Sequence, residues 1–266
     1  MRKRDWPARA CAVLAFAMAV SAAAAAPAAS VVSSLDLAKP FATRSDWRFT
    51  ATQGPPVEGV MGDPAPGPIQ LCLRAGASNP CDPALQGALR TGQADDIFAD
   101  AHYLNAVNIL QPRGPASLPI LWVQAASLYS GDGDQVITTQ VLAYNRAKDS
   151  FARIYEHVTG HNNNQEVRFI AAGPLKGDII SVEPTDMAPY GFWVTVNAFT
   201  PGGPYKRVLR YRSATHYGDG NPLAVIDSEM PNVEQHLGLW KPGAPLPLPA
   251  GPCPKPQLKG GELWCR

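Results

Sequence analysis

The chain has 266 residues, with 23 Lys and Arg against 22 Asp and Glu. Four of the basic residues and one acid lie in residues 1–28, so the remaining chain carries a small net negative charge. A general nucleic-acid binder normally shows a basic surface, and this balance excludes that class. Hydrophobic residues make up 45% of the chain, which is enough for a globular core despite 23 glycines and 27 prolines.

The first 28 residues have the three-part pattern of a secretory signal peptide. A basic start precedes an apolar stretch from Ala10 to Val20, and Ala26-Pro27-Ala28 then supplies an A-x-A motif, so we expect cleavage near Ala28. The apolar stretch is too short to span a ~30 Å hydrocarbon layer. An uncleaved anchor is the alternative, because the alanine run lengthens the stretch. The sequence thus predicts a periplasmic or secreted protein with no membrane span in the mature chain.

Cysteine spacing supports an oxidising compartment. Cys11 leaves with the signal, and an even number of cysteines is typical of exported proteins. Of the three possible pairings, we predict the two that close short local loops, Cys72–Cys81 and Cys253–Cys265. Structural zinc sites normally separate paired cysteines by two to four residues. Neither pair has that spacing, so we expect disulfides and no metal site.

Two helices and a proline-rich arm are predicted outside the main β region. Residues 83–100 and 232–240 are the best helix candidates, and Pro231 stands where a helix commonly begins. Seven prolines between residues 242 and 256 favour an extended, PPII-like conformation. We expect residues 242–266 to form a C-terminal arm closed by the second disulfide.

Residues 29–241 are predicted to form an all-β domain. Runs rich in β-branched and aromatic residues alternate with period two, which indicates half-buried strands. Short connections between these runs favour antiparallel meanders. Two strands are predicted near 46–53 and 69–74. Eight more are predicted at about 103–110, 118–127, 135–144, 150–158, 166–171, 177–183, 191–199 and 204–213.

The eight later strands resemble one four-stranded unit repeated twice, over residues 103–160 and 164–215. Phe151-x-Arg153-Ile154-Tyr155 returns as Tyr205-x-Arg207-Val208-Leu209. A repeat of roughly 50 residues with four antiparallel strands weakly resembles a blade of a β-propeller. A two-sheet sandwich would use the same strands. Chance similarity between two hairpins is the third interpretation.

Three polar phrases are similar to those of an uncharacterised group of exported bacterial proteins. They are Ser130-Gly-Asp-Gly-Asp134, His161-Asn-Asn-Asn-Gln-Glu166 and the segment from Tyr217 to Pro231. This resemblance implies no known activity and therefore transfers no site residue.

The same loops carry the predicted binding residues. A rigid sheet positions such loops, and binding sites favour them. Oxygen-rich loops can bind Ca²⁺, but the EF-hand pattern fails here, and Gly, Asn and Asp are also what tight turns require. We therefore expect no cofactor, with Ca²⁺ as the alternative, and we expect these loops to share one end of the structure. The residues are Asp132, Asp134, His161, Asn162, Asn163, Asn164, His216, Asp219 and Asn221.

Three carboxylates are weak catalytic candidates. Asp227 and Glu229 flank Ser228, and residues i and i+2 of an extended segment point to the same side. Two carboxylates so placed could do the acid–base work of a glycosidase, with Glu183 as a further partner. The ordinary explanation is that such acids are solvated or cap a helix. The nucleophile-elbow, Walker A, H-E-x-x-H and G-x-G-x-x-G motifs are absent from the sequence.

These observations favour a non-enzymatic exported β-protein that binds a protein or an envelope glycan through its Asn/Asp/His loops. The alternative is an envelope glycan hydrolase that uses Asp227 and Glu229.

Overall fold

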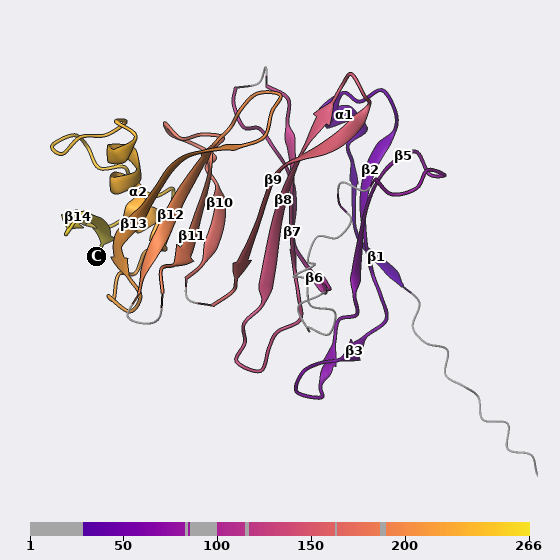
Figure 1. The fold of residues 1–266 in the computed structure, drawn as a ribbon, viewed down its shortest axis with the longest axis horizontal. Helices are drawn as coiled ribbons and strands as arrows, with labels where there is room; N and C mark the ends of the chain where they lie inside the picture. The colour runs from indigo at the N-terminus through magenta and orange to yellow at the C-terminus, as the bar shows by residue number, and fades with distance from the viewer. Residues whose placement is uncertain (1–28, 83–84, 86–99, 115–116, 163, 187–189) are drawn as a thin grey trace, which may run out of the picture.

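The computed structural model describes residues 29–82, 85, 100–114, 117–162, 164–186 and 190–266. The predicted signal peptide and nearly all of the helix predicted at 83–100 lie outside these residues. Strands dominate the described chain, in three stacked sheets followed by a helix and a small hairpin (Figure 1). The all-β prediction is confirmed. In the part of the chain that the structure describes, no helix is long and apolar enough to cross a membrane.

The first sheet has the strand order β1-β2-β5. Strands β2 and β5 are the two predicted near 46–53 and 69–74, whereas the sequence pattern did not indicate β1 or the short helix that follows it. A two-stranded hairpin, β3 and β4, projects between β2 and β5. The bounds are β1 Ser30–Asp36, α1 Ala38–Phe41, β2 Trp47–Gln53, β3 Val57–Glu58, β4 Pro64–Ala65 and β5 Ile69–Ala75.

All eight later strands are present, in two four-stranded antiparallel meanders. The orders are β6-β7-β8-β9 and β10-β11-β12-β13, so each strand pairs with its neighbours in the chain. The predicted boundaries are accurate to within a few residues. The bounds are β6 Tyr103–Leu110, β7 Ile120–Ala126, β8 Val136–Asn145, β9 Ser150–Gly160, β10 Glu166–Phe169, β11 Ile179–Pro184, β12 Gly191–Ala198 and β13 Lys206–His216.

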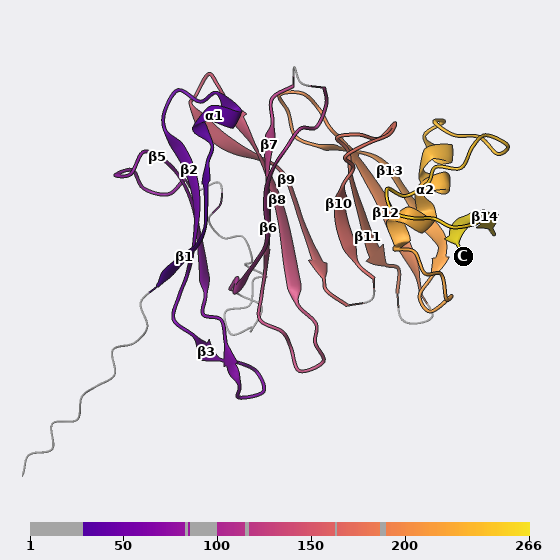
Figure 2. The same cartoon turned by 180° about the vertical axis from the view of Figure 1, so that it is seen from behind.

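Both four-stranded sheets are covered on both faces, as Figures 1 and 2 show from opposite sides. Leu121 of β7 packs with Phe49 of β2 in the apolar cluster between the first two sheets. Its neighbour Trp122 points the other way and joins Ile179 of β11 in the cluster between the two meanders. A third cluster lies between β10–β13 and the helix α2. Each cluster therefore joins two successive layers.

Helix α2 spans Val225–His236, with Pro231 inside it rather than ahead of it. The helix start predicted at residue 232 is wrong, because a residue distant in the sequence stabilises an earlier first turn. The N–H of Ile226 donates a hydrogen bond to Oε1 of Glu166 at 3.1 Å. This carboxylate on β10 satisfies an N–H of the first helical turn and carries the charge that the positive end of a helix favours.

Both predicted disulfides are formed, Cys72–Cys81 and Cys253–Cys265. The second closes a hairpin of β14 (Pro256–Lys259) and β15 (Glu262–Cys265), which turns through Gly260 and Gly261 with φ of 60° and 98°. Glycine adopts such positive φ angles without strain. The end of the predicted arm is therefore a hairpin, and only the residues before β14 lack strands and helices.

Asp149, in the turn between β8 and β9, fastens the first sheet to the second. Its carboxylate accepts hydrogen bonds from the Ser45 hydroxyl at 2.5 Å, from Nε1 of Trp47 at 3.1 Å, and from the Tyr144 hydroxyl. These bonds, that from Ser45 foremost, lower the pKa of Asp149 to about 2. The ionised carboxylate is thus the form that the folded state holds.

Replacing Asp149 with Asn should remove an acid-dependent part of the stability. A carboxylate with a lowered folded-state pKa stabilises the fold above its unfolded-state pKa, and this contribution disappears as the pH falls through the folded-state value. We expect the free energy of unfolding of the wild type to decline more steeply than that of D149N between about pH 5 and pH 2, in urea titrations. If the free energies of unfolding of wild type and D149N changed with pH in parallel, the role of Asp149 in fastening the two sheets would be contradicted.

Gly177, between β10 and β11, has a φ of +91°, and a Cβ there would lie 2.1 Å from the carbonyl oxygen of Pro112. Gly202, between β12 and β13, is a matched control with a φ of +71° and no atom within 4 Å of its Cβ position. We expect G202A to lower the free energy of unfolding by about 1 kcal/mol through backbone strain alone. G177A should lower the free energy of unfolding by clearly more than G202A, because the added Cβ also forces the backbone of Pro112 to move away. Equal losses in guanidinium denaturation would argue against this close approach.

Candidate functional site

The described members of the predicted binding set lie at the end of β13 and on the three connections that follow β7, β9 and β13, which emerge at one end of the stack (Figure 1). Two of these loops are bonded to each other. Oδ1 of Asp134 accepts the backbone N–H groups of His161 at 2.9 Å and of Asn162 at 3.0 Å. The third loop contacts the connection between β11 and β12, because the N–H of Tyr217 donates to the carbonyl of Tyr190 and their rings stack.

Several of the predicted residues serve their own turns. Asp132 accepts a hydrogen bond from the Ser130 hydroxyl, which is the main reason that the pKa of Asp132 is lowered. Asp219 accepts the N–H of His216 at 3.1 Å and that of Asn221 at 2.7 Å. These carboxylates fold the loops and leave less of their bonding capacity for a ligand.

The asparagines have similar roles. The side-chain amide of Asn221 donates to the Ser228 hydroxyl at 2.9 Å and to the Leu263 carbonyl at 3.0 Å, so it ties its loop to α2 and β15. Asn164 has a φ of 56°, which asparagine tolerates better than most residues, and Asn163 lies outside the described residues. Within the described ranges, no three His, Cys, Asp or Glu side chains gather as cation ligands.

Exposed apolar side chains lie beside these turns. At the tip of the β3–β4 hairpin, Met61 is 78% exposed and Val60 is 45% exposed. This tip lies near the β7–β8 turn, since a Cβ added to Gly131 would lie 3.9 Å from the Met61 sulfur. The sequence signal for this feature is an apolar pair between two glycines, and a search for strand-like alternation does not detect it.

Aromatic rings lie at the same end of the stack. Tyr129 is 45% exposed and lies edge-on to Tyr103 at 5.5 Å and to His161 at 5.9 Å between ring centroids. Edge-to-face contacts of this kind hold rings in fixed orientations. We call the combined surface the aromatic rim, formed by Val60, Met61, Tyr103, Tyr129 and His161.

The predicted pairing of Asp227 with Glu229 is wrong, because both lie in α2, where residues i and i+2 point to different sides. Asp227 is half-buried and bonds Arg168 at 2.6 Å. Glu229 is fully buried, and its carboxylate is saturated with donors. They are the Thr215 N–H at 2.8 Å, the Thr215 hydroxyl at 2.7 Å, the Tyr211 hydroxyl at 2.8 Å and the Asn232 amide at 3.0 Å.

Glu183, the third carboxylate candidate, lies on the other face of its sheet. Its neighbour Val182 belongs to the cluster under α2, whereas Oε1 of Glu183 lies 2.7 Å from Nε2 of His157 on β9. The close contact with His157 is the main cause of the lowered pKa of Glu183, and the charge of Arg210 adds to it. Glu183 therefore bridges the two meanders and cannot act together with Asp227 or Glu229.

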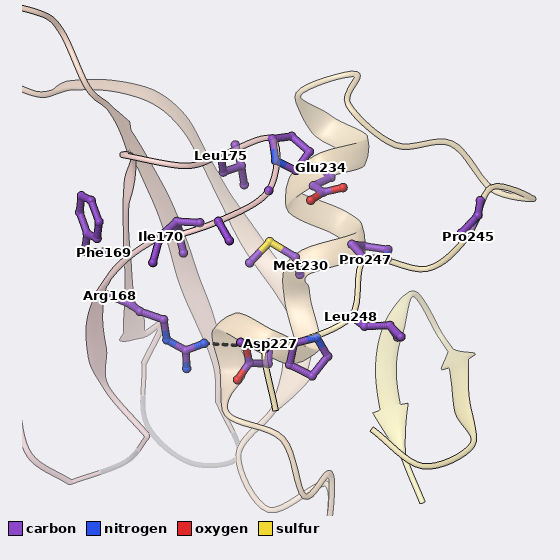
Figure 3. A pocket seen from close by; sticks show the side chains of 16 residues that line it. Arg168, Phe169, Ile170, Leu175, Asp227, Met230, Glu234, Pro245, Pro247 and Leu248 are labelled. Carbon is purple, nitrogen blue, oxygen red and sulfur yellow. Dashed lines mark hydrogen bonds and ion pairs between the residues drawn. The ribbon is translucent and has the colours of Figure 1, made fainter. Parts of the chain in front are cut away.

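A pocket of about 490 Å³ lies between the β10–β11 connection, α2 and the proline-rich arm (Figure 3). Sequence analysis missed it because its walls come from three separate segments. Its apolar lining includes Ile170, Leu175, Met230 and Leu248 with Pro174, Pro245, Pro247 and Pro249. Its ionisable lining consists of Arg168, Asp227 and Glu234.

The charged groups of this pocket differ in how many hydrogen bonds and ion pairs they make. Arg168 pairs with Asp227 at 2.6 Å and with Glu166 at 2.9 Å. Glu234 is only 7% exposed, and among the described residues its carboxylate has no hydrogen bond and no ion pair. Burial alone raises the pKa of Glu234. A carboxylate with a raised pKa on the wall of a pocket is a candidate functional group.

No protein-family model matches this chain, and comparisons with curated proteins and with solved structures find no similar protein. The geometry of the described residues is therefore the basis for inferring a function.

Replacing Glu229 with Ala should lower the free energy of unfolding by about 3 kcal/mol or more, because buried donors lose their shared acceptor. Glu58, which is exposed on β3, provides the matched control, and E58A should change stability by less than about 0.5 kcal/mol. Urea denaturation at neutral pH measures both. A loss for E229A no larger than that for E58A would contradict the structural role and return Glu229 to the catalytic candidates.

Proposed function

We propose that this is an exported, non-catalytic binding protein whose aromatic rim docks on a protein partner in the cell envelope. The exposure of Met61 beside Val60 and Tyr129 carries the proposal. Methionine and tyrosine are enriched in protein interfaces, whereas lysine and glutamate are depleted. Contiguous apolar surface on a soluble domain is uncommon and typically marks an interaction site.

The rim has a rigid support, which favours binding. Asp134 fixes the backbone beneath His161, and ring contacts hold Tyr103 and Tyr129. A preorganised surface loses little conformational entropy on association. The Asn and Asp residues of the loops thus contribute by shaping the turns, while the neighbouring apolar groups supply the contact.

Export is the second part of the proposal. The signal-like pattern of residues 1–28 and two disulfides with short loops support an oxidising compartment. Cleavage near Ala28 would start the mature chain directly before β1. Mass spectrometry of the protein from the cell envelope should give a first residue within a few positions of Ala29.

A photo-reactive residue in place of Met61 should form one discrete protein adduct in cells that export the chain. The matched control is Val208 on β13, a side chain 50% exposed outside the rim, where the same photo-reactive residue should form no such adduct. Tyr129→Ala should abolish the adduct at Met61, because the ring contributes buried area to the interface. Circular dichroism checks that each variant is folded.

Two outcomes would overturn the protein partner. Equal adducts from Met61 and Val208 would mean non-specific contact. Absence of an adduct, together with sedimentation on peptidoglycan sacculi that Y129A abolishes, would identify a glycan as the ligand of the rim.

A further inference from the structure

We infer that the pocket between β10, α2 and the proline-rich arm binds an amphiphilic amine, with an aliphatic body in the apolar lining and a protonated amino group on Glu234. This site is separate from the aromatic rim, so the inference goes beyond the proposed function and can fail independently of it.

The size and lining of the pocket suit a small aliphatic ligand. Its volume of about 490 Å³ falls within the range of roughly 300–1,000 Å³ that is usual for small-molecule sites. Ile170 and Leu175 come from the β10–β11 connection, Met230 comes from α2, and Pro247 and the half-exposed Leu248 come from the arm (Figure 3). Methionine adapts its shape to a flexible chain.

The arm provides a wall that is already formed. Nε1 of Trp240 donates to the Pro245 carbonyl at 2.9 Å, and the Cys253–Cys265 disulfide holds the other end of the segment. Proline fixes φ, so this segment has few alternative conformations to lose when a ligand binds.

Arg168 does not make the pocket an anion site. Its guanidinium is bonded to both Asp227 and Glu166, and Glu166 in turn accepts the N–H of Ile226. The three side chains together carry one net negative charge. An anionic ligand would have to displace a carboxylate from a charge-assisted bond, which is among the stronger polar contacts in proteins.

Glu234 supplies the recognition of a cation. Its carboxylate lines the pocket, is 7% exposed and has no partner among the described residues. It also lies in the last turn of α2, where the helix dipole is negative and favours a nearby positive charge. A ligand ammonium would satisfy the carboxylate and the dipole together, in a setting where burial strengthens the ion pair.

Calorimetric titration with three probes of equal chain length tests the inference. Decylammonium should bind more tightly than decanol, and decanoate should bind most weakly. Glu234→Gln should weaken decylammonium binding by at least about tenfold, which corresponds to about 1.4 kcal/mol, and leave decanol binding unchanged. Glu58→Gln, on the exposed strand β3, is the matched control and should change none of the three affinities.

A second variant tests whether the ligand occupies this pocket, and it leaves the Glu234 carboxylate unchanged. Ala172 is an exposed residue of the pocket lining, so Ala172→Trp should obstruct the site without disturbing the core. We expect it to abolish binding of decylammonium and decanol alike, with an unchanged circular dichroism spectrum.

Two further probes in the same titration distinguish a lipid headgroup from a free amine as the natural ligand. Dihexanoyl phosphatidylethanolamine below its micellar concentration should bind, and dihexanoyl phosphatidylglycerol should not, if the ligand is a lipid headgroup. Binding of decylammonium alone would indicate a free amine. Tighter binding of decanoate, equal affinities that E234Q leaves unchanged, or no binding of any probe would each overturn the inference.

Discussion

The burial of both meanders on both faces is the constraint on which the rest of the structure depends. In β8 every residue from Thr138 to Leu142 is buried, although a sheet with one solvated face would bury only alternate residues. Most buried polar groups in proteins have a hydrogen-bond partner. The saturated Glu229 under α2 follows this rule, and Glu183 lies against His157 between the meanders, whereas the Thr138 hydroxyl on β8 has no hydrogen-bond partner among the described residues.

The layers attach to one another by a repeated device. The hairpin between the third and fourth strands of each meander carries a pair of rings, Tyr144 with Phe151 and Phe199 with Tyr205, at centroid distances of 5.4 and 5.6 Å. The first pair packs in the cluster shared with the first sheet, and the second in the cluster shared with the preceding meander. Phe151 and Tyr205 thus each pack toward the layer that precedes their own meander.

Local patterns predict this chain well and long-range contacts decide the rest. Ten strands and both disulfides follow from period-two alternation and cysteine spacing, because those signals are local. The sequence pattern did not indicate strand β1, because Ser-Val-Val-Ser-Ser-Leu-Asp does not alternate polar and apolar residues with period two. It did not indicate the start of α2, because Glu166 from another sheet accepts a hydrogen bond from the first helical turn. The predicted pairing of Asp227 with Glu229 assumed an extended backbone, but the segment is helical. The pocket could not be predicted, because its walls come from three segments that are distant in the sequence.

The contrast between two carboxylates on α2 supports a binding role for the pocket. Glu229 is fully buried, Glu234 is 7% exposed, and both belong to the same helix. The first receives hydrogen bonds from Thr215, Tyr211 and Asn232, whereas the second receives none among the described residues. The fold can thus satisfy a buried carboxylate on this helix with its own donors. Local rules are most often violated at functional sites, and an unsatisfied Glu234 at the wall of an apolar pocket leaves a donor to be supplied by the ligand.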